Sequence, residues 1–134
     1  LDLRARALTR LGRSADAIAT ARRLVATAPG LAWAAGTLAE ALAAADSLAS
    51  ARAIADSLER SPEAGLTFPS ALARAHAVLG NGDRAIHWLE RALRERSSAI
   101  AYLQVEPAYD SLRGDPRFVQ LLLDAGLAKR GAER

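Results

Sequence analysis

The chain has 134 residues, of which 51% are hydrophobic and 25% are charged. This balance is typical of one folded soluble domain and does not favour a disordered chain. No cysteine is present, which excludes disulfides and thiolate-ligated metal ions. The net charge of +3 arises from 18 basic and 15 acidic residues without a clustered basic stripe, and we therefore expect no nucleic-acid partner.

Alanine dominates the composition and favours closely packed helices, and the β-branched residues nowhere alternate as in a strand. We therefore expect an all-α chain. Apolar periodicity, together with breakers such as Gly12, Pro29 and Gly80, predicts six helices in the first 97 residues. Their expected ranges are 3–11, 14–28, 31–44, 46–60, 69–80 and 83–96. The second, fourth and sixth helices are expected to be capped by Ser14, Asp46 and Asp83.

Alanine also recurs at one fixed interval along the chain. Three columns share the same spacing: Ala5, Ala39 and Ala73; Ala7, Ala41 and Ala75; Ala17, Ala51 and Ala85. In a chain that is one quarter alanine, chance gives roughly half of one such column over this period. Gly12 and Gly80 mark the same turn two periods apart. The spacing indicates a helix–turn–helix unit repeated three times, which is an array of αα-hairpins.

A 34-residue helix–turn–helix unit with small residues at fixed positions resembles the tetratricopeptide repeat. In that family, two small positions mark the crossing of the paired helices, and the columns that begin at Ala5 and Ala17 fill them. The resemblance implies that residues 1–97 form three helix pairs stacked into a right-handed superhelix. The chain departs from the family at Asp46, where the turn glycine is usual. It also departs at the fourth position, where Leu1, Ala35 and Pro69 replace a large aromatic residue.

The repeat period is lost after Ser97. Residues 98–127 are expected to form capping helices over 99–104, over 107–112 and from Asp115-Pro116 to Gly126, and residues 128–134 a frayed tail. The side chains expected to cover the end of the array are Tyr102, Tyr109, Leu112, Phe118, Leu121 and Leu122. The string from Gly82 to Phe118 resembles the end of repeat regions attached to bacterial signalling proteins, including serine/threonine kinases, nucleotide cyclases and transcription regulators.

A search for reactive groups predicts no enzymatic activity, no cofactor and no metal. His76 falls in the register of apolar residues and is expected to be a partly buried core histidine. His87 and Glu90 are three residues apart on one helical face, without a further ligand at suitable spacing. Gly80-Asn81-Gly82 lacks the residues that follow in a phosphate-binding loop and is expected to be a turn.

The resemblance implies a groove lined by the first helix of each pair. The candidate groove residues that it gives are Arg6, Arg10, Trp33, Thr37, Glu40, Ser70 and Arg74. Three arginines among them favour an acidic or C-terminal peptide, because guanidinium groups match carboxylates. Chaperone-binding members of the family carry a lysine–asparagine carboxylate clamp, whose first sites here hold Asp2 and Arg6, so a chaperone cofactor role is not expected.

We therefore expect a protein- or peptide-binding scaffold or regulatory module of a larger bacterial protein. The chain contains no methionine and begins at Leu1, which is typical of a fragment; a cytoplasmic location without membrane contact is favoured. Two alternatives remain open. The chain could form a homo-oligomer through the Leu1 end or the region of Trp33, or it could sense a small molecule bound around His76, Trp88 and Tyr102.

Overall fold

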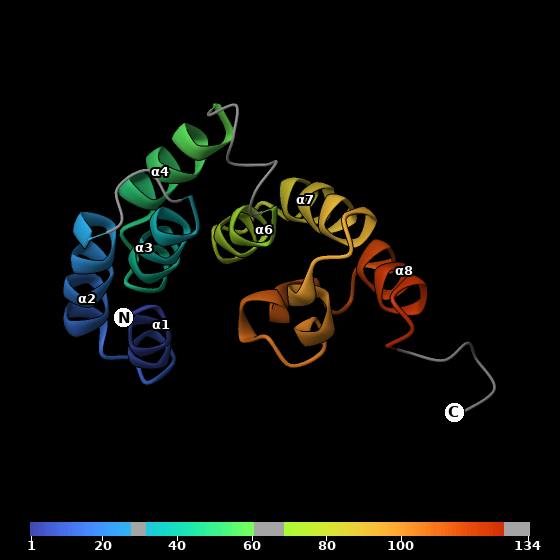
Figure 1. The fold of residues 1–134 in the computed structure, drawn as a ribbon, viewed down its shortest axis with the longest axis horizontal. Helices are drawn as coiled ribbons and strands as arrows, with labels where there is room; N and C mark the ends of the chain where they lie inside the picture. Colours follow the sequence, from blue (N-terminus) through green and yellow to red (C-terminus); the bar gives the residue numbers. More distant parts are fainter. Residues whose placement is uncertain (28–31, 61–68, 128–134) are drawn as a thin grey trace.

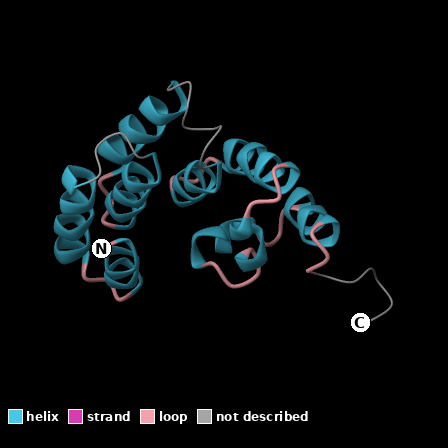
Figure 2. Ribbon diagram, in the orientation of Figure 1, coloured by secondary structure: helices cyan, strands magenta, loops and turns pink. Residues whose placement is uncertain are grey.

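The computed structural model describes residues 1–27, 32–60 and 69–127, and of Ala32 and Trp33 the backbone alone. Every regular element in these ranges is a helix, as Figure 2 shows, so the expected all-α class is confirmed. The elements are α1 (Asp2–Arg10), α2 (Ser14–Thr27), α3 (Ala32–Ala44), α4 (Leu48–Arg60), α6 (Pro69–Val78), α7 (Gly82–Arg94), η1 (Ser98–Tyr102), η2 (Pro107–Leu112) and α8 (Pro116–Asp124), where η marks a 3-10 helix. The expected tail at 128–134 and the expected breaker Pro29 lie outside the described residues.

The helices pack in the order in which they follow along the chain. Helices α1 and α2, α3 and α4, and α6 and α7 contact each other as pairs, and α2 contacts α3 while α3 contacts α6. Figure 1 shows them along an arch, with α1, α3 and α6 on its inner side and α2, α4 and α7 on its outer side. Each pair therefore buries one flank against the next pair.

Small side chains stand where these helices approach one another. The alanine columns that begin at Ala5 and Ala17 are completely buried, at 0% exposure in all six positions. In the third column, Ala41 and Ala75 are buried, but Ala7 of α1 is exposed. A methyl group added at Gly36 of α3 would lie 3.0 Å from the Cβ of Ala71 in α6. The backbones are this close because their side chains are so small.

Left-handed residues end five of the helices, with backbone φ angles of 54° to 80°: Gly12, Asp46, Gly80, Arg96 and Gly126. After each one, the next amide donates to a carbonyl five residues earlier, as Ser47 does to Leu42. The predicted capping role of Asp46 is therefore wrong, because Asp46 ends α3 instead of starting α4.

The other two predicted caps are also displaced. The residue at the cap position of a helix is the one whose carbonyl accepts the first helical hydrogen bond. In α2, α4 and α7, these residues are Arg13, Ser47 and Asn81. Asn81 caps α7 in place of Asp83, and its side chain accepts the amide of Arg84 at 3.4 Å. Ser14 is the first residue within α2. The three observed cap residues are one repeat period apart. The predicted cap residues lie one or two positions away from them.

The segment from η1 to α8 shares a hydrophobic core with α6 and α7. Of the side chains expected to cover this end, Leu122 is partly buried and four are buried: Tyr109, Leu112, Phe118 and Leu121. The expectation for Tyr102 is wrong, because its side chain is 63% exposed. The tight 3-10 turn of η1 directs Ile100 and Leu103 inward instead, and Tyr102 faces the inner side of the arch.

We expect Asp46→Gly to raise the free energy of unfolding by about 1 kcal/mol, because glycine adopts the left-handed conformation without the steric cost that a β-carbon imposes. Urea unfolding measures the effect, and Gly80→Ala at the equivalent turn should change stability in the opposite direction. An unchanged or lower stability for Asp46→Gly would contradict this account of the turn.

Candidate functional site

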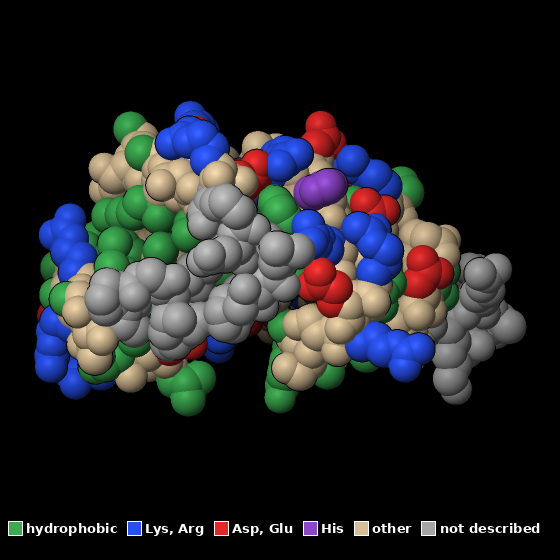
Figure 3. Space-filling model, turned by 45° about the horizontal axis from the view of Figure 1, so that its top comes forward, with side chains coloured by type: hydrophobic (Ala, Val, Ile, Leu, Met, Phe, Trp, Pro, Cys, Tyr) green, Lys and Arg blue, Asp and Glu red, His purple; other side chains and the backbone are tan. Residues whose placement is uncertain are grey.

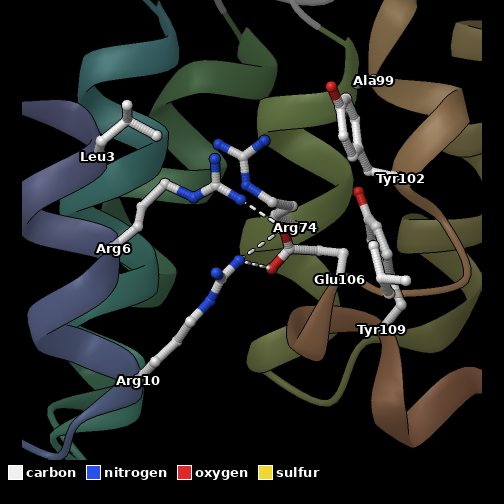
Figure 4. A pocket seen from close by; sticks show the side chains of 9 residues that line it. Leu3, Arg6, Arg10, Arg74, Ala99, Tyr102, Glu106 and Tyr109 are labelled. Carbon is white, nitrogen blue, oxygen red and sulfur yellow. Dashed lines mark hydrogen bonds and ion pairs between the residues drawn. The ribbon is translucent and has the colours of Figure 1, made fainter.

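An open cleft of about 450 Å³ lies on the inner side of the arch, between α1 and the segment that carries η1 and η2. Its lining residues are Leu3, Arg6, Arg10, Arg74, Ala99, Tyr102, Val105, Glu106 and Tyr109. Figure 4 shows the α1 side chains reaching across the cleft toward Arg74 and Glu106. Leu3, Arg6 and Arg10 are spaced so that one face of α1 presents all three.

Glu106 is the carboxylate at the centre of this cleft. Arg6 Nη2 donates to Glu106 Oε2, and Arg10 Nη2 lies 3.1 Å from Oε1 and 3.0 Å from Oε2. The Glu106 side chain is 7% exposed, whereas that of Arg10 is 48% exposed. Arg113 holds the turn by donating to the Glu106 carbonyl at 3.1 Å. Two guanidinium groups of α1 therefore bind one carboxylate that lies about a hundred residues further along the chain.

A second set of polar contacts supports the floor of the cleft. Arg74 Nε donates to Glu40 Oε2 at 3.2 Å, and Thr37 Oγ1 donates to Asp2 Oδ1 at 2.5 Å. Burial would lower the pKa of Arg74, but the charge and hydrogen bond of Glu40, together with the charges of Tyr109 and Glu106, outweigh burial and raise the pKa. Burial also raises the pKa of Tyr109, although Arg74 opposes this. Arg74 and Tyr109 therefore both keep their protons at neutral pH.

Three of the predicted groove residues meet in this cleft, namely Arg6, Arg10 and Arg74. Thr37 and Glu40 lie below its surface, at 1% and 6% exposure, and support the arginines without being accessible themselves. Ser70 is half-buried and does not line the cleft. The side chain of Trp33 lies outside the described residues. Arg6, Glu40 and Arg74 are spaced by one repeat period, so their charges alternate along one column.

The opposite wall of the cleft was not predicted as part of the groove, because residues 98–127 were expected to cap the array. Of its side chains, Tyr102 alone was assigned a binding role, in the small-molecule alternative. This wall contributes Glu106 and the side chains of Tyr102, Val105 and Tyr109. Leu3, Tyr102 and Val105 form an apolar rim, at 79%, 63% and 71% exposure. One signal was present in the sequence: a single acidic residue, Glu106, interrupts an otherwise mostly apolar stretch before a proline.

A separate polar cluster surrounds Glu59 at the end of α4. Arg84 Nε and Trp88 Nε1 each donate to Glu59 Oε1 at 3.1 Å, and His76 Nε2 contacts the same oxygen. Burial would raise the pKa of Glu59, but the hydrogen bonds from Arg84 and Trp88, together with the charges of His76 and Arg84, outweigh burial and lower the pKa. Burial lowers the pKa of His76 below 6.5, although Glu59 opposes this. His76 is 3% exposed, so it is a core histidine, more deeply buried than expected.

This cluster does not join the cleft. His76 follows Arg74 by two residues in α6, so the two side chains point about 200° apart around the helix. Tyr102 lines the cleft with Arg74, whereas His76 and Trp88 contact Glu59. The structure therefore does not bring His76, Trp88 and Tyr102 around one cavity, as the small-molecule alternative requires.

Comparison with known proteins finds no match to this chain among family models, curated proteins or solved structures. Within the described ranges, no group of three or more histidine, aspartate or glutamate side chains is placed to hold a metal ion. None of the helices in those ranges is both long enough and apolar enough to span a bilayer.

The His76 cluster predicts a pH dependence of stability. Because its pKa is lowered from 6.5 in the folded chain, His76 adds stability above that value, and the contribution is lost as the pH falls toward the folded pKa. His76→Gln keeps a neutral donor beside Glu59 but cannot titrate. Between about pH 7.5 and about pH 5.5, the wild-type chain should lose more unfolding free energy than His76→Gln, by up to about 1.4 kcal/mol per pH unit.

Urea unfolding at several pH values measures this difference. The exposed His87 provides the control, since His87→Gln should keep the pH dependence of the wild-type chain. The same pH dependence for the wild-type chain and for His76→Gln would show that His76 is not the titrating group.

Proposed function

We propose that this chain is an array of tetratricopeptide-type helix pairs that binds a protein or peptide partner through the cleft between α1 and η2. It is a non-catalytic scaffold or regulatory module of a larger bacterial signalling protein, and the partner contributes a carboxylate. One observation carries the proposal: Arg6 and Arg10 both bind a carboxylate at the wall of an open cleft.

The repeat assignment is supported by the coincidence of several features at one spacing. Buried alanines, helix caps and left-handed turn residues recur once in every repeat period, and each helix pair packs against the next. One helix pair cannot bury both of its flanks, so stacking of equivalent pairs is the arrangement that such a pattern favours. The inner side of the stack is then formed by α1, α3 and α6.

The nature of the ligand follows from the lining of the cleft. Guanidinium groups bind carboxylates through paired, charge-assisted hydrogen bonds, and those of Arg6 and Arg74 are largely shielded from solvent, at 19% and 12% exposure. The apolar rim lies next to them. A peptide with an apolar residue beside a carboxylate would satisfy both parts of the cleft.

Two further observations favour binding over catalysis or nucleic-acid contact. An arginine side chain stays protonated and charged at any physiological pH, and the raised pKa of Tyr109 keeps its hydroxyl neutral, so neither group exchanges a proton with a ligand. On the face shown in Figure 3, basic and acidic side chains are interspersed. Such a surface favours a protein or peptide partner that binds a local arginine site over a nucleic acid, which needs a continuous basic stripe.

Binding of synthetic peptides tests the proposal. The probe is a hexapeptide that ends in two leucines with a free carboxylate, compared by calorimetry with the same peptide amidated at its C terminus. We expect the free carboxylate to improve affinity for the wild-type chain, but by less than the about 1.5–3 kcal/mol of an uncontested charge-assisted hydrogen bond, because the same arginines also bind Glu106. Arg10→Ala should remove this advantage, and a third peptide, amidated but with an internal glutamate, reports whether a side-chain carboxylate suffices.

Arg10 is the best residue to change, because it is half-exposed, whereas Arg74 is paired with the buried Glu40. Arg13→Ala serves as the matched control, since Arg13 is exposed in the turn between α1 and α2 and pairs with Asp16. It should bind the peptides like the wild-type chain. Equal affinity of the acid and amide peptides for the wild-type chain and for Glu106→Gln would contradict the proposed function.

Self-association is a second candidate, favoured by exposed leucines at both ends of α1. Leu3 is 79% exposed and Leu11 is 72% exposed. Burial of these side chains against a second copy would remove apolar surface from water. Sedimentation at increasing concentration should then show a dimer that Leu3→Glu combined with Leu11→Glu dissociates. A wild-type chain that stays monomeric at high concentration excludes this candidate.

A further inference from the structure

The carboxylate of Glu106 already occupies the position that a partner's carboxylate would take. It accepts from both Arg6 and Arg10, and it lines the cleft next to the exposed side chains of Tyr102 and Val105. Its own chain thus provides the group that the arginines bind, from a short segment on the opposite wall. The position of Glu106 therefore limits how a second carboxylate can enter the cleft.

The charges around the cleft are balanced. Three guanidinium groups, of Arg6, Arg10 and Arg74, meet three carboxylates, of Asp2, Glu40 and Glu106. A fourth carboxylate would have no cation left to neutralise it and would be repelled by the first three. An incoming carboxylate must therefore replace one that is present.

Of these three carboxylates, Glu106 is the one that lines the cleft. Glu40 is buried against Arg74, and Asp2 accepts a hydrogen bond from Thr37 while lying 4.0 Å from Arg6. We propose that Glu106 is an internal ligand of the arginine site, and that a partner's carboxylate binds by displacing it. This inference rests on the proposed function and specifies how the same site is regulated.

The exchange can occur without unfolding the segment that carries Glu106. The backbone of the turn is held separately, because Arg113 donates to the Glu106 carbonyl and the Glu106 amide donates to Tyr102. Tyr109 and Leu112 anchor η2 in the core. Rotation of the Glu106 side chain toward solvent therefore releases the arginines. It also breaks the long hydrogen bond, of 3.4 Å, that the Glu106 side chain accepts from the amide of Ala108.

A tethered carboxylate competes as if it were present at roughly millimolar concentration. A free carboxylate alone is therefore a weak ligand for the wild-type site. A partner gains an advantage when it also covers the apolar rim of Leu3, Tyr102 and Val105, which Glu106 leaves exposed. The internal ligand thus makes the site selective for a carboxylate that arrives together with apolar side chains.

The test is Glu106→Gln, which keeps the shape of the side chain and removes its charge. The free-carboxylate hexapeptide should bind this variant about tenfold or more tightly than it binds the wild-type chain, because the internal competitor is weakened. Affinity for the amidated peptide should stay the same. Asp110→Asn is the matched control: Asp110 lies in η2, which Glu106 caps, its side chain is 69% exposed, and the substitution changes the net charge equally. It should leave both affinities unchanged.

A second measurement, thermal unfolding, tests the proposal even if a substitution at Glu106 destabilises the fold. In Glu106→Ala, acetate should raise the melting temperature more than chloride does at equal ionic strength, because acetate can occupy the vacated position, and the wild-type chain should show a smaller difference. No preference for acetate, or a variant that stays unfolded in acetate, would show that Glu106 is structural and would overturn the proposal. Chloride corrects for general screening of the arginines.

The outcomes separate this inference from the proposed function. A wild-type chain that prefers the acid peptide, with no gain in Glu106→Gln, overturns the internal ligand and leaves peptide binding in place. A gain that Asp110→Asn reproduces also overturns it, because the gain then follows from net charge alone. If neither the wild-type chain nor Glu106→Gln distinguishes the acid from the amide, both the proposed function and this inference fail.

Discussion

Helix backbones in this chain approach closely at positions where the side chain is no larger than a methyl group. Ala5, Ala39 and Ala73 are completely buried at such positions. Each is followed directly by a charged residue, so the register that nests the helices also places Arg6, Glu40 and Arg74 in one column on the inner side of the arch. A larger residue in the alanine column would separate the helices and with them the charges that make the cleft.

Helix α6 connects the two polar networks of the molecule. One of its faces directs Arg74 into the cleft, and the opposite face directs His76 toward Glu59 of α4. The same helix packs against α3, α4, α7 and η2. The use of arginine throughout matters here, because a planar guanidinium can satisfy a carboxylate with two parallel hydrogen bonds, as Arg84 does with Glu59.

The helices and one wall of the cleft could be predicted because their signals are local or periodic. Apolar spacing and breakers located the helices, and the resemblance to the tetratricopeptide repeat implied that Arg6, Arg10 and Arg74 line one groove. The caps were misplaced because Asp46 can end a helix as well as start one, and its left-handed backbone is decided by the turn as a whole. Glu106 was missed because its partners lie about a hundred residues away, and no pattern of neighbouring residues records such a contact.

The separation between Arg6 and Glu106 also bears on the order in which the chain folds. The helix pairs are hairpins, whose contacts join residues near in sequence and require the closure of short loops alone. The bridge from α1 to η2 can form only after the intervening helices have brought the two ends together. We therefore expect the bridge to form late in folding, so that its loss would accelerate opening of the arch more than it would slow the formation of the hairpins.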